Sequence, residues 1–136
     1  MSRAINNSAQ IKPGVEIYYV EGVFGRKEMT YHEISHQVVV SEPIRSHFVP
    51  TARSFLFAYK FYGGSEIFHH YLNDLRISHG EVPAPCYNLN RVFLTLKDAK
   101  SFVDEINSLN FSNPDDQKVF MDNAESYDES YDDLEF

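Results

Sequence analysis

The chain of 136 residues has one cysteine, no tryptophan and no long apolar run. A single thiol, Cys86, cannot form an internal disulfide, so we expect a protein of a reducing compartment. No apolar run approaches the roughly 18 residues that a membrane-spanning helix needs. The first ten residues, MSRAINNSAQ, lack the apolar segment of a secretory signal. The sequence therefore predicts a cytoplasmic protein with no membrane partner.

Motifs of catalysis and of cofactor binding are also missing. The sequence has no GxSxG, no phosphate-binding loop, no GxGxxG and no CxxC motif, so we expect neither an enzyme nor a cofactor. His32 and His36 have the spacing of a metal-binding pair, but both fall in an expected strand, where four residues span roughly 13 Å. His69 and His70 would point to opposite faces of another strand. The sequence thus predicts no metal site.

The charge of the chain is distributed unevenly. Residues 113–136 contain nine acids and one base, Lys118, and alone carry the net charge of −8. The other eleven acids and eleven bases balance one another. This pattern predicts a neutral body with an anionic C-terminal arm. It disfavours a general binder of duplex DNA, which normally has a basic face, and it permits an anionic surface to occupy a partner's basic groove.

The hydrophobic pattern predicts strands followed by helices. Gly63-Gly64 separates two strand-like segments and is expected to form a hairpin turn. Thr95 and Asn113 are expected to cap two helices. This order favours a mainly β, α+β fold, a small antiparallel barrel of the SH3-like or OB-like type with one or two C-terminal helices and an acidic tail. The expected strands are residues 15–20, 29–40, 53–62, 66–72 and 91–94, and the first helix should bury Ala99, Phe102, Val103, Ile106 and Leu109.

A hydrophobic content of 43% over this length is enough for one folded domain with flanking segments. Residues 1–13 are polar and lack periodicity, so we expect a flexible N-terminal arm. Residues 14–112 form the expected barrel domain with its helix, and residues 113–124 an acidic helix. Residues 125–136 have few groups to bury and should be a disordered acidic tail.

Two segments of this pattern carry a resemblance to a known class of fold. KPGVEIYYV reads as a first strand, and NLNRVFLTLKDAKSFV reads as a last strand followed by a helix. Together with the long hairpin between them, they resemble the small SH3-like barrels of many phage and bacterial proteins. The resemblance covers roughly residues 13–109, and it implies a scaffold for binding.

The C-terminal sequence ESYDESYDDLEF is a tandem acidic and aromatic repeat. Its last five residues, DDLEF, resemble the acidic C-terminal tip of single-stranded-DNA-binding proteins, with Glu135 where that family often has proline. The resemblance implies that the terminal aromatic docks on a partner enzyme while the acids meet basic residues around it. The alternative is a self-repelling, solubilising tail. The expected partner-binding residues are Tyr127, Tyr131, Asp132, Asp133, Leu134, Glu135 and Phe136.

An aromatic series, Phe55, Phe57, Tyr59 and Phe61, shares one face of the expected strand 53–62. Such a series usually lines a core, although unpaired bases could stack on it. Surface stacking is more plausible for tyrosines that have a cation nearby. The residues considered for contact with nucleic acid are Tyr18, Arg53, Lys60, Tyr62, Tyr71 and Arg91.

Two hypotheses of function follow from these patterns. The leading one is a non-enzymatic, phage-type accessory protein in the host cytoplasm. It would act as an inhibitor or adaptor and engage a basic protein of the nucleic-acid machinery through an acidic surface and the tail. The alternative is a protein that binds single-stranded nucleic acid and recruits partner enzymes with its phenylalanine-terminated tail. The sequence predicts no oligomeric state.

Overall fold

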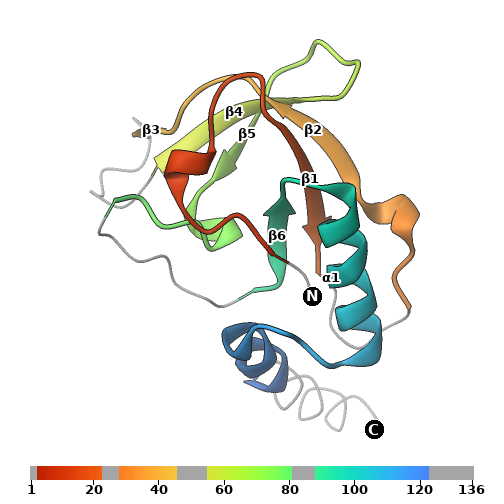
Figure 1. Ribbon diagram of the computed structural model, residues 1–136. Coiled ribbons are helices and arrows are strands. Elements are labelled where there is room, and N and C mark those ends of the chain that lie inside the picture. Colours follow the sequence, from red (N-terminus) through yellow and green to blue (C-terminus); the bar gives the residue numbers. More distant parts are fainter. Residues whose placement is uncertain (1–2, 23–27, 46–54, 81–87, 123–136) are drawn as a thin grey trace, which may run out of the picture.

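The computed structural model describes residues 3–22, 28–45, 55–80 and 88–122 of the chain. Six strands within these residues form one antiparallel sheet with helices against it (Figure 1). The α+β class is therefore confirmed. The sheet is open, and the predicted SH3-like or OB-like barrel is not confirmed. The strands are β1 (Glu16–Glu21), β2 (Ser35–Val39), β3 (Ile44–Arg45), β4 (Phe55–Phe61), β5 (Phe68–Tyr71) and β6 (Asn90–Phe93).

The strand order is β3-β4-β2-β1-β6, and β5 pairs with β4. β1, β2, β4 and β5 form a meander in which each strand pairs with the next of the four. β6 then returns to the free side of β1. β1 consequently pairs with a strand on each side, and so does β4, the most apolar strand of the sequence.

The segment predicted as one strand, residues 29–40, contains a helical turn and a shorter strand. The N–H of Thr30 donates to Oε2 of Glu33 at 2.7 Å, which closes the 3-10 turn η2 (Tyr31–Glu33). Within this segment, only Ser35–Val39 forms a strand. The prediction that His32 lies in a strand was wrong, because a Thr-x-x-Glu capping sequence outweighed the period-two pattern.

A first apolar cluster lies against one face of the sheet. Its members on β4, Phe57 and Tyr59, confirm the interpretation of that part of the aromatic series as core. Phe61, at the end of the same series, is 45% exposed. The short 3-10 turn η3 (Asn73–Leu75) supplies Leu75, and its N-cap residue Leu72 also belongs to the cluster. The cluster comprises Ile5, Ile11, Ile17, Val39, Phe57, Tyr59, Leu72, Leu75, Ile77 and Val92.

The N-terminal segment belongs to this core, in contrast to the predicted flexible arm. Ile5 and Ile11 are buried in the first cluster, on either side of the 3-10 turn η1 (Ser8–Gln10). The N–H of Ile5 donates to the carbonyl of Val92 at 2.8 Å, and the N–H of Ser8 donates to that of Ser78 at 2.8 Å. Two isolated isoleucines are enough to anchor the segment, although their spacing produces no periodic signal.

The helix α1 (Leu96–Ser108) covers the opposite face of β1 and β6. It begins as predicted, with Oγ1 of Thr95 accepting from the N–H of Asp98 at 3.1 Å. Ala99, Phe102, Val103 and Ile106 are buried as expected and join a second apolar cluster with Val20, Met29, Leu89, Phe93, Phe111 and Val119. Leu109 differs from the prediction. It ends the helix in the left-handed conformation, at φ 59°, and is half exposed.

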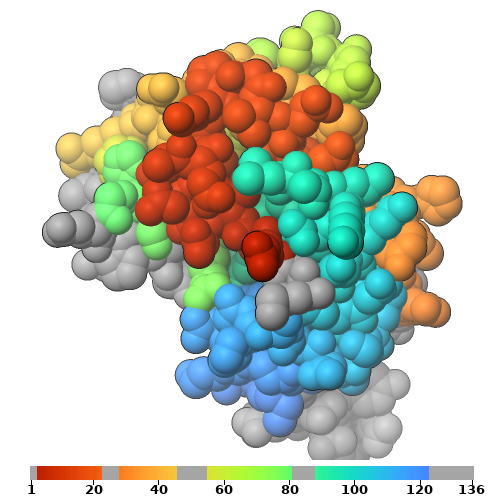
Figure 2. All heavy atoms as spheres, viewed as in Figure 1, coloured from red at the N-terminus to blue at the C-terminus, as the bar shows by residue number. Residues whose placement is uncertain are grey.

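A second helical segment, residues 114–122, follows a short connection. It starts where predicted, with Oδ1 of Asn113 accepting from the N–H of Asp115 at 2.9 Å. Val119 and the preceding Phe111 pack into the second cluster, and Figure 2 shows the two helices, from teal to blue, as one continuous surface. The acidic helix is therefore docked on the body. The predicted tail, residues 125–136, lies outside the described residues.

Candidate functional site

Eight of the predicted site residues lie outside the described part of the chain. They are Arg53 and the seven partner-binding residues of the tail, Tyr127, Tyr131, Asp132, Asp133, Leu134, Glu135 and Phe136. Cys86 also lies outside it. The structure places the other five, Tyr18, Lys60, Tyr62, Tyr71 and Arg91.

Three aromatic rings stack across the strands on one face of the sheet. Tyr18 of β1 lies opposite His36 of β2, and the N–H of Tyr62 donates to the carbonyl of His36 at 3.0 Å. The ring centroids of Tyr18 and His36 are 4.5 Å apart with 15° between the planes, and those of His36 and Tyr62 are 4.3 Å apart with 7°. Lys60, opposite Val38, lies on the same face. We call Tyr18, His36 and Tyr62 the ring ladder.

The other two candidates do not join the ring ladder. Tyr71 pairs with Leu56 near the start of β4, whereas Tyr62 follows the end of that strand. Arg91 is only 1% exposed, and its Nη2 donates to Oδ1 of Asp116 at 2.7 Å. Arg91 therefore neutralises an acid of the second helix and offers no charge to a ligand at the surface, in contrast to its predicted role.

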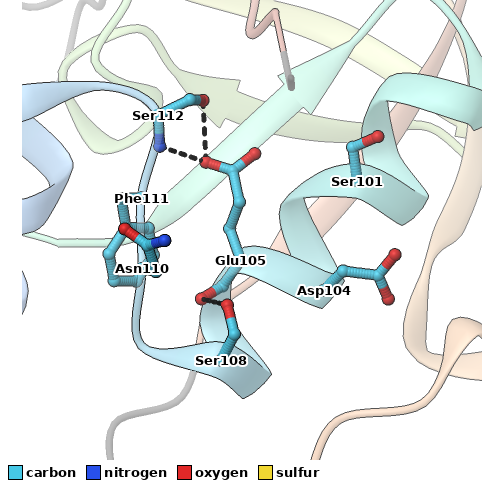
Figure 3. A pocket seen from close by; sticks show the side chains of 7 residues that line it. All are labelled: Ser101, Asp104, Glu105, Ser108, Asn110, Phe111 and Ser112. Carbon is cyan, nitrogen blue, oxygen red and sulfur yellow. Dashed lines mark hydrogen bonds between the residues drawn. The ribbon is translucent and has the colours of Figure 1, made fainter.

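The C-terminal end of α1 forms a second surface feature, a depression of about 560 Å³ (Figure 3). Glu105 reaches across it, and its Oε1 accepts from the backbone N–H of Ser112 at 2.6 Å and from the hydroxyl of Ser112 at 2.8 Å. Asp104 points away from Glu105 in this view. The lining is rich in oxygen atoms and comprises Ser101, Asp104, Glu105, Ser108, Asn110, Phe111 and Ser112.

A second depression, of about 510 Å³, adjoins the first and shares Asp104 with it. The segment before η2 lies against α1 here, because Nδ2 of Asn107 donates to the carbonyl of Met29 and its Oδ1 accepts from the N–H of Met29, both at 2.8 Å. Glu28 adds a carboxylate. The lining comprises Glu28, Met29, Thr30, Tyr31, His32, Asp104 and Asn107.

Both depressions are rich in carboxylates, and Nζ of Lys100 lies 5.3 Å from the ring centroid of Tyr31 at the second one. Their described lining contains three carboxylates, those of Glu28, Asp104 and Glu105, and no lysine or arginine. The last turn of α1 itself contains no basic residue, so no side chain of that turn offsets the negative end of the helix dipole. The hydroxyl of Tyr31 donates to Oδ1 of Asp104 at 2.7 Å, and this hydrogen bond raises the pKa of Tyr31. We call the two depressions together the acidic end of α1.

The partly buried side chain of His70 packs against the first cluster. The ring of His70 stacks on Tyr59 with centroids 4.0 Å apart, and its Nε2 lies 2.8 Å from Oε1 of the buried Gln37. Nε2 of Gln37 in turn donates to Oγ of Ser35 at 3.0 Å. Burial lowers the pKa of His70 from 6.5 to about 4, and it is the main cause that raises the pKa of Tyr19 to about 12. His70 is therefore neutral at pH 7.

Acidification should destabilise the fold through His70. Protonation of His70 is more favourable in the unfolded chain than in the folded protein. The contribution of His70 to the free energy of unfolding is therefore complete above pH 6.5 and is lost as the pH falls towards its folded pKa of about 4. We expect this residue to contribute a loss of about 3 kcal/mol between pH 7 and pH 4. Urea unfolding at both pH values measures it, and His70→Phe should remove this part of the pH dependence.

His69→Phe is the matched control for this prediction, because His69 is the adjacent residue and is exposed. Both variants keep the carboxylates, which contribute equally to any remaining pH dependence. The free energy lost by the His69 variant between pH 7 and pH 4 should match that of the wild type. Equal losses in the two variants would contradict the assignment to His70.

The described residues include no group of three or more His, Cys, Asp or Glu side chains placed to hold a metal ion. Of the predicted contacts, the structure brings Tyr18, Lys60 and Tyr62 together on one face. Sequence reasoning missed His36, which lies between the two tyrosines in the ring ladder. Its strand was identified, but the strand register that aligns the three rings has no local signal. The acidic end of α1 was also missed, since it joins segments about 75 residues apart.

Comparison with known proteins agrees with a phage origin. No curated protein and no solved structure matches the chain. Among the described residues, no helix has the length and apolar character needed to cross a bilayer. The family model of the phage g100-like proteins matches residues 5–106, which include all six strands and most of α1. The chain belongs to the phage g100-like protein family.

Proposed function

We propose that this phage protein is a non-enzymatic accessory protein that binds a basic surface of a partner protein, as an inhibitor or adaptor of the nucleic-acid machinery. The observation that carries the proposal is the acidic end of α1. Three carboxylates, several hydroxyls and the negative end of a helix converge there. Lysine and arginine side chains only donate hydrogen bonds, so a surface rich in acceptors suits them.

The distribution of charge supports the same proposal. Residues 123–136 add six acids and no base to the chain. Anionic groups of this number steer a basic partner during encounter and raise the association rate, and salt reduces the effect. The resemblance of DDLEF to the tip of single-stranded-DNA-binding proteins suggests that the partner acts on nucleic acid.

The experiment is capture of partners from a lysate of the phage host by the immobilised full-length protein, followed by measurement of affinity for the retained protein. Asp104→Asn removes one charge from the acidic end of α1 but keeps an oxygen that can accept from Tyr31. We expect the affinity to fall about fivefold, which corresponds to about 1 kcal/mol for a partly exposed charge pair. The difference should fade at high salt.

Asp98→Asn is the matched control, since it makes the same change of charge in the first turn of the same helix. It should bind the partner as the wild type does. Retention of no specific protein, or equal weakening by the two variants, would refute the proposal. Binding that does not depend on salt would also refute it.

A further inference from the structure

The ring ladder is a second surface with its own geometry. Tyr18, His36 and Tyr62 come from three different segments, and the ladder spacing of the sheet sets the distance between their rings. Angles of 15° and 7° between successive planes leave the three rings nearly parallel. Oε1 of Glu16 lies 2.8 Å from Nε2 of His36 and holds the middle ring in place. The ladder is thus ordered before any ligand arrives.

The Tyr62 end of the ladder is open. Tyr62 is 64% exposed, although one side of its ring is covered by His36. The hairpin between β4 and β5 begins here and projects from the sheet (Figure 1). Apart from its two chain neighbours, no residue lies within 4 Å of a Cβ placed on the next residue, Gly63, so the start of the hairpin is not packed against other elements of the protein. Tyr62 therefore presents a flat aromatic face to solvent at the end of the ladder.

The chemistry of this end favours a planar ring as the ligand. A fourth ring placed on Tyr62 continues the column, whereas an aliphatic side chain fills only part of the flat face. Lys60 lies two residues before Tyr62, on the same face of the sheet, and offers a positive charge. Nucleic-acid bases combine a planar ring with a neighbouring phosphate, and they are free to stack on protein only when unpaired.

We propose that Tyr62, at the end of the ring ladder, stacks an unpaired base of single-stranded nucleic acid, with Lys60 beside the phosphate. Tyr18 and His36 support the ring of Tyr62 and do not touch the ligand. This site is distinct from the acidic end of α1, where the described lining includes no lysine or arginine. A protein with both surfaces would bring a basic partner to a single strand.

Fluorescence anisotropy with a labelled strand of about 15 deoxythymidines tests this proposal on the full-length protein. A salt concentration of about 0.1 M limits repulsion by distant acids, because exposed charges more than about 10 Å away are then largely screened. We expect saturable binding tighter than about 100 µM. Tyr62→Ala should weaken it about tenfold, and Tyr62→Phe, which keeps the ring, should stay within about twofold of the wild type.

Two controls separate base stacking on Tyr62 from attraction of the phosphates alone and from stacking on any exposed aromatic ring. Phe61→Ala removes the adjacent exposed ring, which lies on the opposite face of the sheet, and should leave binding unchanged. An abasic strand of equal length keeps the phosphates and should bind about tenfold more weakly. Tyr62→Leu serves as the ring-free variant if the alanine variant fails to fold. Absence of saturable binding, equal binding of the abasic strand, or equal loss in the Phe61 variant would overturn the proposal.

Discussion

Replacing Asp116 with asparagine is expected to lower the free energy of unfolding by about 3–5 kcal/mol. Asp116 is 5% exposed and Arg91 is 1% exposed, with 2.7 Å between Oδ1 and Nη2. Nη1 of Arg91 donates to the carbonyl of Asn90 at 2.7 Å and to Oδ1 of Asn88 at 3.1 Å, but neither acceptor carries a charge. Replacing the carboxylate removes one negative charge that lies in direct contact with a buried guanidinium.

The neighbouring carboxylate is the matched control. Asp115 lies on the same turn of the same helix as Asp116 and pairs with Arg76. The side chain of Asp115 is mostly exposed. Asp115→Asn should therefore cost less than about 1 kcal/mol. Urea unfolding compares the two variants. Equal small costs would mean that residues 114–122 are not docked on β6.

A double replacement distinguishes a buried charge from lost packing. Arg91→Met with Asp116→Leu removes both charges and keeps apolar volume, and such exchanges are often neutral or stabilising. We expect the double variant to be more stable than Asp116→Asn alone. A double variant less stable than the single one would show that the volume and hydrogen bonds of Arg91, and not its charge, account for the effect.

This ion pair also changes the interpretation of the charge distribution. The sequence suggested a neutral body and a detachable anionic arm, with the division near residue 113. In the structure Asp115 and Asp116 lie beyond that division and pair with Arg76 and Arg91 of the body. Counting formal charges along the sequence cannot reveal these ion pairs, because the count is the same whichever charges are in contact. The second helix belongs to the folded body up to at least residue 122.

The features that sequence reasoning predicted correctly have local causes. Thr95 and Asn113 cap helices because their side chains accept from N–H groups two or three residues later. The apolar face of α1 follows from a spacing of three and four residues. The hairpin at Gly63-Gly64 uses the positive φ of Gly63, 80°. Each of these signals is contained within a few residues.

The features that were missed depend on contacts between distant segments. The ring ladder requires the register of β1 against β2 and of β2 against β4. Strand pairing of this kind is set by the whole sheet, so an identified strand does not reveal its neighbours. The acidic end of α1 likewise forms only because Asn107 holds the backbone of Met29. Both candidate surfaces are therefore products of tertiary structure.

Phe102→Ala is also expected to destabilise the protein by about 3–5 kcal/mol. Phe102 is 1% exposed, in the middle of the buried face of α1. Its ring centroid lies 5.3 Å from that of Phe93 on β6 and 6.2 Å from that of Phe111, in the connection to the second helix. Truncation to alanine leaves a cavity where the sheet and both helices meet, and the surrounding elements can fill it only in part.

Leu96→Ala is the control for this prediction, because Leu96 is an apolar residue of the same helix that is 40% exposed and lies outside both apolar clusters. It should cost less than about 1 kcal/mol in urea unfolding, since removing its side chain leaves no cavity. The difference between the two variants measures how firmly α1 is docked. α1 also forms part of the acidic end proposed to bind a basic partner. If the two substitutions cost the same, α1 is not fixed on β1 and β6, and the proposed surface loses its support.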